Sequence, residues 1–138
     1  MEMIRILLDT NAYVAFKRGD IDAVEILRHA DQIGMSVIMM GELLAGFAAG
    51  SHEVRNQSEL DAFLNSPRVN IIPVDQKTTR HYAKIYKQLR QKGRPIPDND
   101  MWIASTAFQH RYVVFTYDKH FSQIDGLPIA SKLADISP

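Results

Sequence analysis

Short apolar runs alternate with longer amphipathic segments along this chain of 138 residues. The runs have strand length and consist largely of Ile, Leu, Val and Met, as buried parallel strands do. Strands are expected at residues 4–8, 35–39, 69–74 and 112–116, with a short edge strand at 129–130. Their alternation with helical segments predicts an α/β domain, in which helices flank a mostly parallel sheet of four to five strands.

Segments with helical spacing of apolar residues fill the intervals between these runs. Helices are expected over residues 11–16, 21–30, 41–49, 52–65, 76–92 and 99–110, with one further helical turn at 119–123. Four short polar residues are expected to cap the helices that follow them, by accepting hydrogen bonds from unpaired N–H groups: Asp20, Ser51, Asp75 and Asp98. Gly34 is expected to break the helix that begins at residue 21, before the second strand.

The composition is that of an ordinary globular domain, with 46% apolar and 23% charged residues, so one domain over residues 1–138 is expected. The absence of cysteine excludes disulfide bonds and thiolate metal sites. No run of about 18 apolar residues and no signal-peptide pattern is present, so we expect a cytoplasmic protein without a membrane segment. Sixteen basic residues balance 16 acidic ones, which argues against nucleic-acid binding through bulk charge.

Four acidic residues stand where apolar runs end: Asp9, Glu42, Asp100 and Asp118. Burying such carboxylates is costly unless a positive charge meets them. Asp9 and Asp118 follow predicted strands, and ligands of open α/β sheets bind outside the carboxyl ends of the strands. Glu42 and Asp100 fall in the first turns of predicted helices, which are expected to point at the same crevice. Converging carboxylates are typical of Mg²⁺ or Mn²⁺ sites and indicate a metal-dependent phosphodiesterase.

Polar neighbours of these acids are hypothesised to support the site. The Thr10 hydroxyl is expected to position water or phosphate, and Asn11 is expected to brace Asp9. Thr116 is expected to brace Asp118. These three residues lie within two positions of an acid along the chain.

Other candidate residues are interpreted as structural. Five histidines lack the spacing typical of metal ligands and are expected to be surface or structural residues: His29, His52, His81, His110 and His120. Asp98 is expected to cap its helix rather than bind metal. Trp102 is expected in the core, because it lies in a largely apolar helix.

Four motifs of this chain resemble those of the PIN-domain ribonucleases, especially the VapC-type toxins of prokaryotic toxin–antitoxin pairs. In chain order they are Leu7-Leu8-Asp9-Thr10-Asn11, Gly41-Glu42-Leu43-Leu44, Asn99-Asp100-Met101-Trp102-Ile103-Ala104 and Thr116-Tyr117-Asp118-Lys119-His120-Phe121. The resemblance covers nearly the whole chain. One departure is that the family often has Ser or Thr a few residues before the second acid, whereas residues 37–40 are apolar here and Ser36 precedes them.

The resemblance implies a single PIN-like domain that hydrolyses RNA at a Mg²⁺ site, with Mn²⁺ as an alternative ion. Asp9 and Asp100 are the implied principal metal ligands, and Glu42 and Asp118 would complete the cage or orient water. A cognate antitoxin protein and a homodimer are implied as well. The resemblance leaves open which RNA is cut and whether one or two ions are bound.

Two surface features have competing interpretations. The basic helix at 76–92 carries Lys84 and Lys87, either on an ordinary solvated face or in contact with RNA. Apolar residues of the third helix region either cover the sheet or form a dimer interface or a groove for a partner helix. These residues are Met39, Met40, Leu43, Leu44 and Phe47.

Three other functions compete with ribonuclease activity. A Mg²⁺-dependent phosphatase of the haloacid dehalogenase type requires a second Asp two residues after the nucleophile, where this chain has Asn11. A phospho-acceptor receiver domain requires an acidic pair in its first loop, where Asp9 stands alone. An inactive PIN-like module that binds RNA or serves as a scaffold would keep the fold without turnover, and the four acids argue against it.

Overall fold

A computed structural model of the chain describes residues 3–136. Its strands are β1 (Arg5–Leu8), β2 (Gln32–Ser36), β3 (Val69–Ile72), β4 (Val113–Phe115) and β5 (Ile129–Ala130). Its α-helices are α1 (Thr10–Lys17), α2 (Ile21–His29), α3 (Val37–Ala49), α4 (Glu53–Leu64), α5 (Gln76–Lys92) and α6 (Asp98–His110). Two 3₁₀ turns, η1 (Lys119–Gln123) and η2 (Leu133–Asp135), complete the described elements. The predicted α/β class is confirmed.

The five strands form one sheet in the order β3-β2-β1-β4-β5, and every adjacent pair is parallel. The chain leaves the central strand β1 toward β2 and β3, then crosses to β4 and β5 on the other side. The strand order therefore reverses between β1 and β4, and ligands of such sheets bind at this reversal, outside the carboxyl ends. The backbone N–H of Asp9 donates to the Phe115 carbonyl at 3.0 Å, which joins these two ends.

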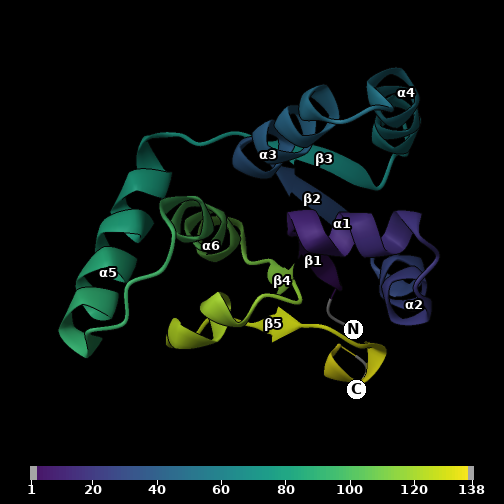
Figure 1. Cartoon of the computed structure of the whole chain (residues 1–138). Helices are drawn as coiled ribbons and strands as arrows, with labels where there is room; N and C mark the ends of the chain where they lie inside the picture. The colour runs from purple at the N-terminus through teal and green to yellow at the C-terminus, as the bar shows by residue number, and fades with distance from the viewer. Residues whose placement is uncertain (1–2, 137–138) are drawn as a thin grey trace.

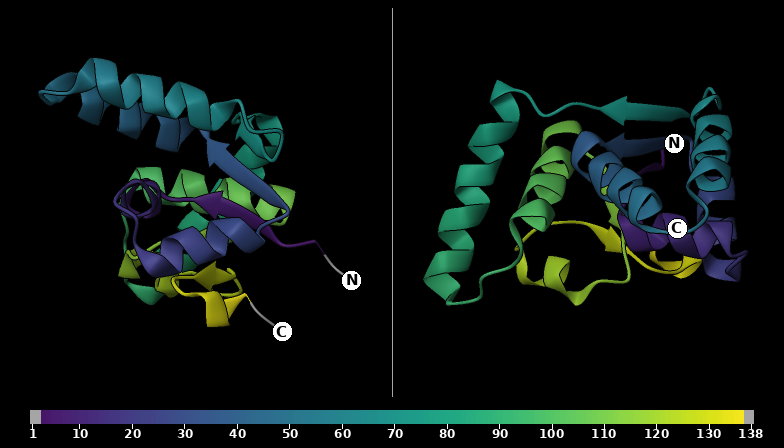
Figure 2. Two further views of the ribbon diagram at one scale, coloured as in Figure 1. Left: turned by 90° about the vertical axis from the view of Figure 1, so that its right-hand side faces the viewer. Right: turned by 45° about the horizontal axis from the view of Figure 1, so that its top comes forward.

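Helices surround the sheet in three groups (Figure 1). Helix α5 packs along α6 on one side of the molecule, and α1 packs against α2 on the other. Helices α3 and α4 lie side by side and project beyond the rest of the molecule in the left view of Figure 2. Within the described residues, none of these helices has both the length and the apolar content needed to cross a membrane.

The apolar runs of β1 and β4 form the centre of the hydrophobic core. Ile6, Leu7 and Leu8 of β1 are completely buried, because β1 has a strand on each side and helices over the sheet. Val114 and Phe115 of β4 are also completely buried. Each such side chain contributes roughly 1.5–3 kcal/mol by leaving water, so the two strands that carry the site are held firmly.

The boundary between the second strand and the third helix differs from the prediction. Residues 35–39 were expected to form a strand, but β2 ends at Ser36 and α3 begins at Val37. The Ser36 hydroxyl accepts a hydrogen bond from the Ile38 N–H at 3.1 Å and caps the helix. The hydroxyl cap that residues 37–40 lack is thus supplied by Ser36, one turn earlier than the predicted helix start.

Gly34 lies inside β2, where a break was expected. A Cβ at this position would stand 2.7 Å from Ile72 Cδ1 and 3.1 Å from both Leu7 Cδ1 and Tyr112 Cε1. Glycine is therefore required by close packing on the sheet rather than by a turn.

We predict that Gly34→Ala lowers the free energy of unfolding by about 1–3 kcal/mol, because the added methyl group overpacks the core. Gly46→Ala is the control, since a Cβ there meets nothing within 4 Å. Alanine in this helix interior should instead add about 0.5–1 kcal/mol. Urea denaturation of the two variants measures both effects, and equal midpoints would contradict the packing argument.

The predicted caps were correct for two helices and wrong for two. Asp20 accepts from the Ala23 N–H at 3.0 Å, and Asp75 accepts from the Thr78 N–H at 3.2 Å. Ser51 does not cap α4, whose N-cap is His52 without a side-chain hydrogen bond. Asp98 is the first residue of α6 rather than its cap, and its carboxylate accepts from the Tyr82 hydroxyl at 3.0 Å. For Asp98, a hydrogen bond from a residue of another helix thus takes the place of the expected capping bond to its own helix.

Candidate metal centre

Asp9 is the most buried acid of the site. It follows β1 and is the N-cap of α1, so Oδ1 accepts from the Thr10 N–H at 2.9 Å. Its Oδ2 accepts from the Thr116 hydroxyl at 2.8 Å. Only 5% of the residue is exposed, and this burial raises the pKa of Asp9 from 3.8 to about 6. Asp9 therefore lies where a cation would relieve the cost of its charge.

Glu42 faces the same space from α3. The Thr10 hydroxyl donates to Glu42 Oε1 at 2.9 Å, and the Asn99 side-chain amide donates to Oε2 at 3.5 Å. Glu42 was predicted to lie in the first turn of its helix. Because α3 begins at Val37, Glu42 lies in the second turn instead. The Thr10 hydroxyl, expected to hold water or phosphate, instead holds the Glu42 carboxylate.

Asp100 and Asp118 meet on the opposite side of this space, and His120 joins them. Asp100 lies in the first turn of α6, whereas Asp118 caps η1 after β4. Nδ1 of His120 lies 2.9 Å from Asp100 Oδ2 and 3.0 Å from Asp118 Oδ1. Burial raises the pKa of Asp100, and the hydrogen bond to Asp100 raises the pKa of His120.

Thr116 connects the two halves of the site. Its hydroxyl donates to Asp9 and accepts from the Asp118 N–H at 2.9 Å. Asn11 was hypothesised to brace Asp9. Its Oδ1 instead accepts a hydrogen bond from the Tyr117 N–H at 3.1 Å. Asn11 thereby holds the end of β4 against the start of α1.

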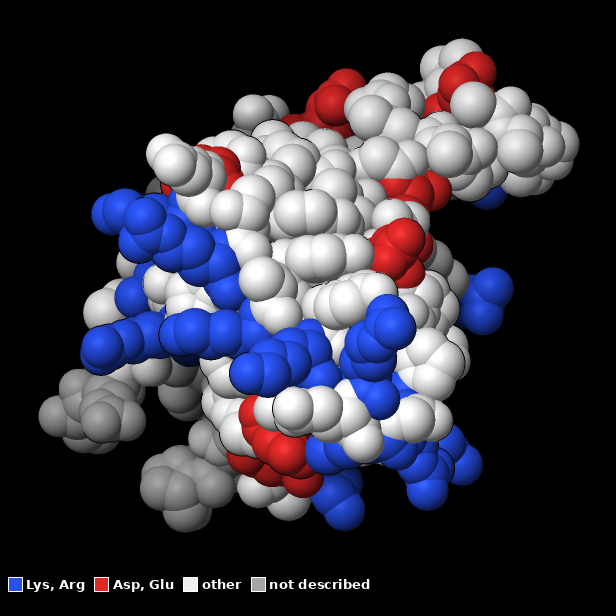
Figure 3. All heavy atoms as spheres, turned by 90° about the vertical axis from the view of Figure 1, so that its left-hand side faces the viewer, with Lys and Arg blue, Asp and Glu red and all other residues white. Residues whose placement is uncertain are grey.

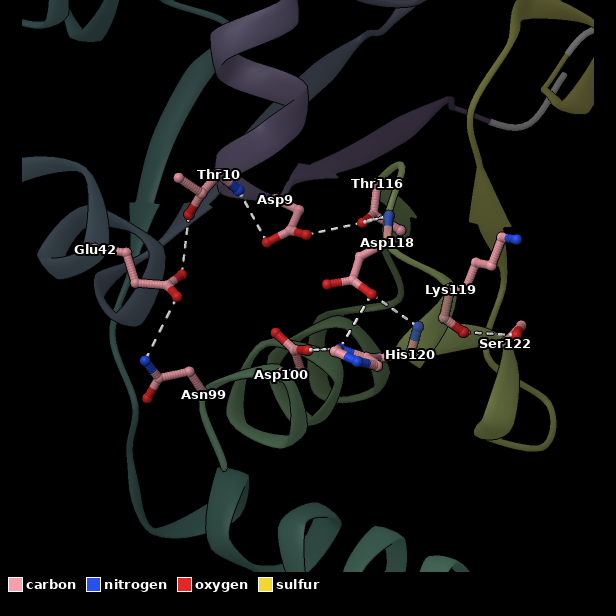
Figure 4. A network of polar contacts seen from close by, with 10 residues as sticks. All are labelled: Asp9, Thr10, Glu42, Asn99, Asp100, Thr116, Asp118, Lys119, His120 and Ser122. Atoms are coloured by element: carbon pink, nitrogen blue, oxygen red, sulfur yellow. Dashed lines mark hydrogen bonds and ion pairs between the residues drawn. The ribbon is translucent and has the colours of Figure 1, made fainter. Parts of the chain in front are cut away.

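All four predicted acids point into one space between the carboxyl ends of β1 and β4 (Figure 4). Within the described part of the chain, the ligand atoms of Asp100, Asp118 and His120 lie within 4.8 Å of one another. This donor set, rich in carboxylate oxygen, fits a hard divalent cation. Sequence reasoning missed His120, although its place two residues after Asp118, beyond a strand end, was an available signal.

Other predicted features lie outside this cluster. Lys84 and Lys87 are exposed on α5, over which Lys and Arg side chains form a band in Figure 3. Trp102 is half-buried rather than in the core, and its ring stacks on Tyr82 with centroids 4.1 Å apart. The apolar residues of α3 divide between interior and surface. Met39 and Leu43 are buried, Met40 and Phe47 are partly buried, and Leu44 is 38% exposed.

Comparison with known proteins agrees with this geometry. The PIN domain family matches residues 6–127. The chain is 35% identical to ribonuclease VapC2 of Rickettsia felis, an alignment that covers 88% of this chain and 92% of that protein. It is 36% identical to ribonuclease VapC1 of Haemophilus influenzae, with the same coverage of each.

Solved structures give the same result. The crystal structure of VapBC2 from Rickettsia felis bound to a promoter DNA fragment contains a chain with a TM-score of 0.79 and 32% identity. That match covers 91% of this chain and 96% of the other. DNA-bound VapBC from Salmonella typhimurium gives a TM-score of 0.81 at 26% identity, over 93% and 98% of the two chains. With its fold, its four acids and these relatives, the chain belongs to the PIN-domain family, among the VapC ribonucleases.

Proposed function

We propose that this protein is a metal-dependent endoribonuclease and the toxin of a toxin–antitoxin pair. The observation that carries the proposal is the convergence of Asp9, Glu42, Asp100 and Asp118 at the reversal of strand order. Its relatives are named ribonucleases, and its structural neighbours are VapBC complexes. Both facts support RNA as the substrate and an antitoxin protein as the partner.

Asp9 and Asp100 are the proposed principal metal ligands, and Glu42 and Asp118 complete the cage or orient water. Mg²⁺ is the proposed ion, and Mn²⁺ is the alternative. When bound, such an ion lowers the pKa of a coordinated water and neutralises charge on the scissile phosphate. The carboxylates of this chain hold negative charge in a partly buried site, where an unpaired charge is costly. The same property gives the site its affinity for cations.

The two threonines are positioning residues in this proposal. Thr116 orients Asp9 and fixes the backbone of Asp118, while Thr10 orients Glu42. Because these hydrogen bonds hold three of the four acids before any substrate arrives, little reorganisation is needed for the reaction. Water displaces the 3′ oxygen from phosphorus, so the products are a 3′ hydroxyl and a 5′ phosphate.

Incubation of the purified protein with total cellular RNA tests this function. Parallel reactions contain Mg²⁺, Mn²⁺ or EDTA, and an Asp9→Asn/Asp100→Asn variant serves as the inactive control. We expect discrete cuts that require the metal, are absent with the variant, and map to defined sites by end analysis. Tight metal binding without cleavage of any RNA would favour an inactive module, and hydrolysis of small phosphoesters instead would refute the ribonuclease assignment.

Helix α5 is the proposed path of the RNA beyond the site, since Lys84 and Lys87 are exposed on it. We predict that Lys84→Gln/Lys87→Gln weakens RNA binding and lowers the slope of log K against log salt by about 1–2, the number of lost phosphate contacts. Arg18→Gln/Arg28→Gln makes the same change of net charge on α1 and α2. Equal salt slopes for the two double variants, measured by fluorescence anisotropy, would remove α5 from the binding surface.

A homodimer is the proposed assembly, acting in the cytoplasm. Val37 and Leu44 of α3 and Ile71 of the edge strand β3 are exposed apolar residues, and they supply surface that a second copy would cover. We expect light scattering to give twice the chain mass of 15.7 kDa. A monomer at micromolar concentration would contradict the dimer without affecting the ribonuclease assignment.

A further inference from the structure

His120 lies at the edge of the acidic site, although the proposed function assigns no role to it. It lies in η1, two residues after Asp118, and its ring is 48% exposed at the edge of the acidic space. Only Nδ1 of the ring faces the acids, at 2.9 Å from Asp100 and 3.0 Å from Asp118 (Figure 4). The ring thus places one nitrogen between two carboxylates that come from different elements.

These separations match the geometry of neighbouring ligands around a small cation. In an octahedral site with bonds of about 2.1 Å, adjacent ligand atoms lie about 3.0 Å apart. The contacts from Nδ1 to the two carboxylate oxygens have this length. All three ligand atoms also lie within 4.8 Å of one another, so the three residues form a group that could hold one ion.

We propose that Nδ1 of His120 is a ligand of the cation held by Asp100 and Asp118, and that it adds more to the affinity of this centre for Mn²⁺ than to its affinity for Mg²⁺, which stays the proposed ion of the reaction. The inference deepens the proposed function, on which it rests for the presence of a catalytic cation. Imidazole nitrogen binds transition metals well, whereas Mg²⁺ prefers oxygen ligands and water. Ligation uses the Nδ1 lone pair, so Nδ1 carries no hydrogen when the ion is bound: a proton held there passes to solvent, and Nε2 bears the one hydrogen of the neutral ring.

A different role for His120 would produce the same contacts without a metal bond. A protonated imidazole between two carboxylates is itself a good bridge and would hold them together as a counterion. That role gives no nitrogen–metal bond and no preference between the two ions. Spectroscopy of the bound ion therefore separates the two explanations, whereas cleavage rates alone do not.

The test is pulsed electron paramagnetic resonance of Mn²⁺ bound to the purified wild-type protein, with calorimetry of Mn²⁺ and Mg²⁺ binding. His120→Asn removes the ring but keeps a polar group near the position of Nδ1. His52→Asn is the matched control, because His52 is exposed and is the N-cap of α4, where asparagine is favourable. We expect nitrogen modulation from a directly bound imidazole in the wild-type and His52→Asn proteins, and its loss in His120→Asn.

Affinity should follow the same pattern. We expect His120→Asn to weaken Mn²⁺ binding by about 10–100-fold, the range for altered metal-site residues, and Mg²⁺ binding by less than about threefold. Absence of imidazole modulation in the wild-type protein would overturn the inference even if the variant failed to fold. Equal weakening for both ions would overturn the selectivity. Either result together with normal RNA cleavage would leave the proposed function intact, whereas no cleavage by a metal-loaded protein would refute the function itself.

Discussion

Asp100→Asn is expected to reduce the rate of RNA cleavage at saturating Mg²⁺ by about a thousandfold or more, equivalent to about 4 kcal/mol of transition-state stabilisation. Asparagine keeps the size and one oxygen of the side chain but removes its negative charge. Asp100 is 8% exposed and faces Asp118 and His120, so its charge lies at the proposed metal site. Single-turnover cleavage of the mapped RNA measures the effect.

Asp98→Asn is the matched control for this variant. Asp98 lies in the same helical turn, but its carboxylate accepts from Tyr82 rather than facing the metal space. The asparagine oxygen keeps that hydrogen bond, so cleavage should stay within about threefold of wild type. A comparable loss in both variants would mean that the first turn of α6 acts through general charge or through folding, and that Asp100 has no specific role.

Asp9→Asn is expected to stabilise the metal-free protein at about pH 7.5, by about 2–3 kcal/mol, while abolishing cleavage. Burial raises the pKa of Asp9 from 3.8 to about 6, so at neutral pH folding must hold a charge that the unfolded chain carries at less cost. Asparagine removes the charge and keeps an oxygen that accepts from Thr116. Urea denaturation in EDTA measures the difference.

The sign of the pH dependence follows from the raised pKa. Below about pH 4, Asp9 is protonated in both the folded and the unfolded protein, so the fold buries no charge there and is at its most stable with respect to this group. The wild-type protein loses this stability as the pH rises through about 6, where the buried Asp9 ionises. The advantage of Asp9→Asn should therefore shrink as the pH falls from about 7.5 to 4. Mg²⁺ should raise the stability of the wild-type protein more than that of the variant, which keeps the other three acids but lacks one charge of the site. A variant less stable than wild type at neutral pH in EDTA would contradict the burial argument.

The Asp9→Asn variant connects stability with function through one physical cause. The charge of Asp9 destabilises the metal-free fold because water is excluded from the carboxylate, and the same exclusion favours a cation. Thr116 limits the cost by donating one hydrogen bond to Asp9, as the helix N-terminus does through the Thr10 N–H. A protein selected for stability alone would not keep an acid at this position.

Much of the fold followed from local rules. The spacing of apolar residues located β1, α2, α5 and β5, and the caps Asp20 and Asp75 were identified from their own side chains. These features depend on contacts within a few residues, which are visible in the sequence. The four acids were also identified locally, because each interrupts or follows an apolar run that commits its neighbours to burial.

The errors occurred where distant residues decide. Gly34 reads as a helix breaker locally, but Leu7, Ile72 and Tyr112 pack so closely around it within the strand that a side chain there would displace them. Asp98 reads as a cap, but the Tyr82 hydroxyl from α5 takes its carboxylate. In both cases a tertiary contact outweighed a local preference that is worth about 1 kcal/mol or less.

By itself, the sequence determined the α/β class, a mostly parallel sheet of short apolar strands and the choice of the four acids, because periodicity and burial of carboxylates are properties of short segments. Only the tertiary structure decided which atoms meet. It bound Thr10 to Glu42, placed Thr116 between Asp9 and Asp118, and brought His120 to Asp100 across 20 residues of chain. Such pairings depend on the register of β1 against β4 and on the packing of α6, which no local pattern encodes.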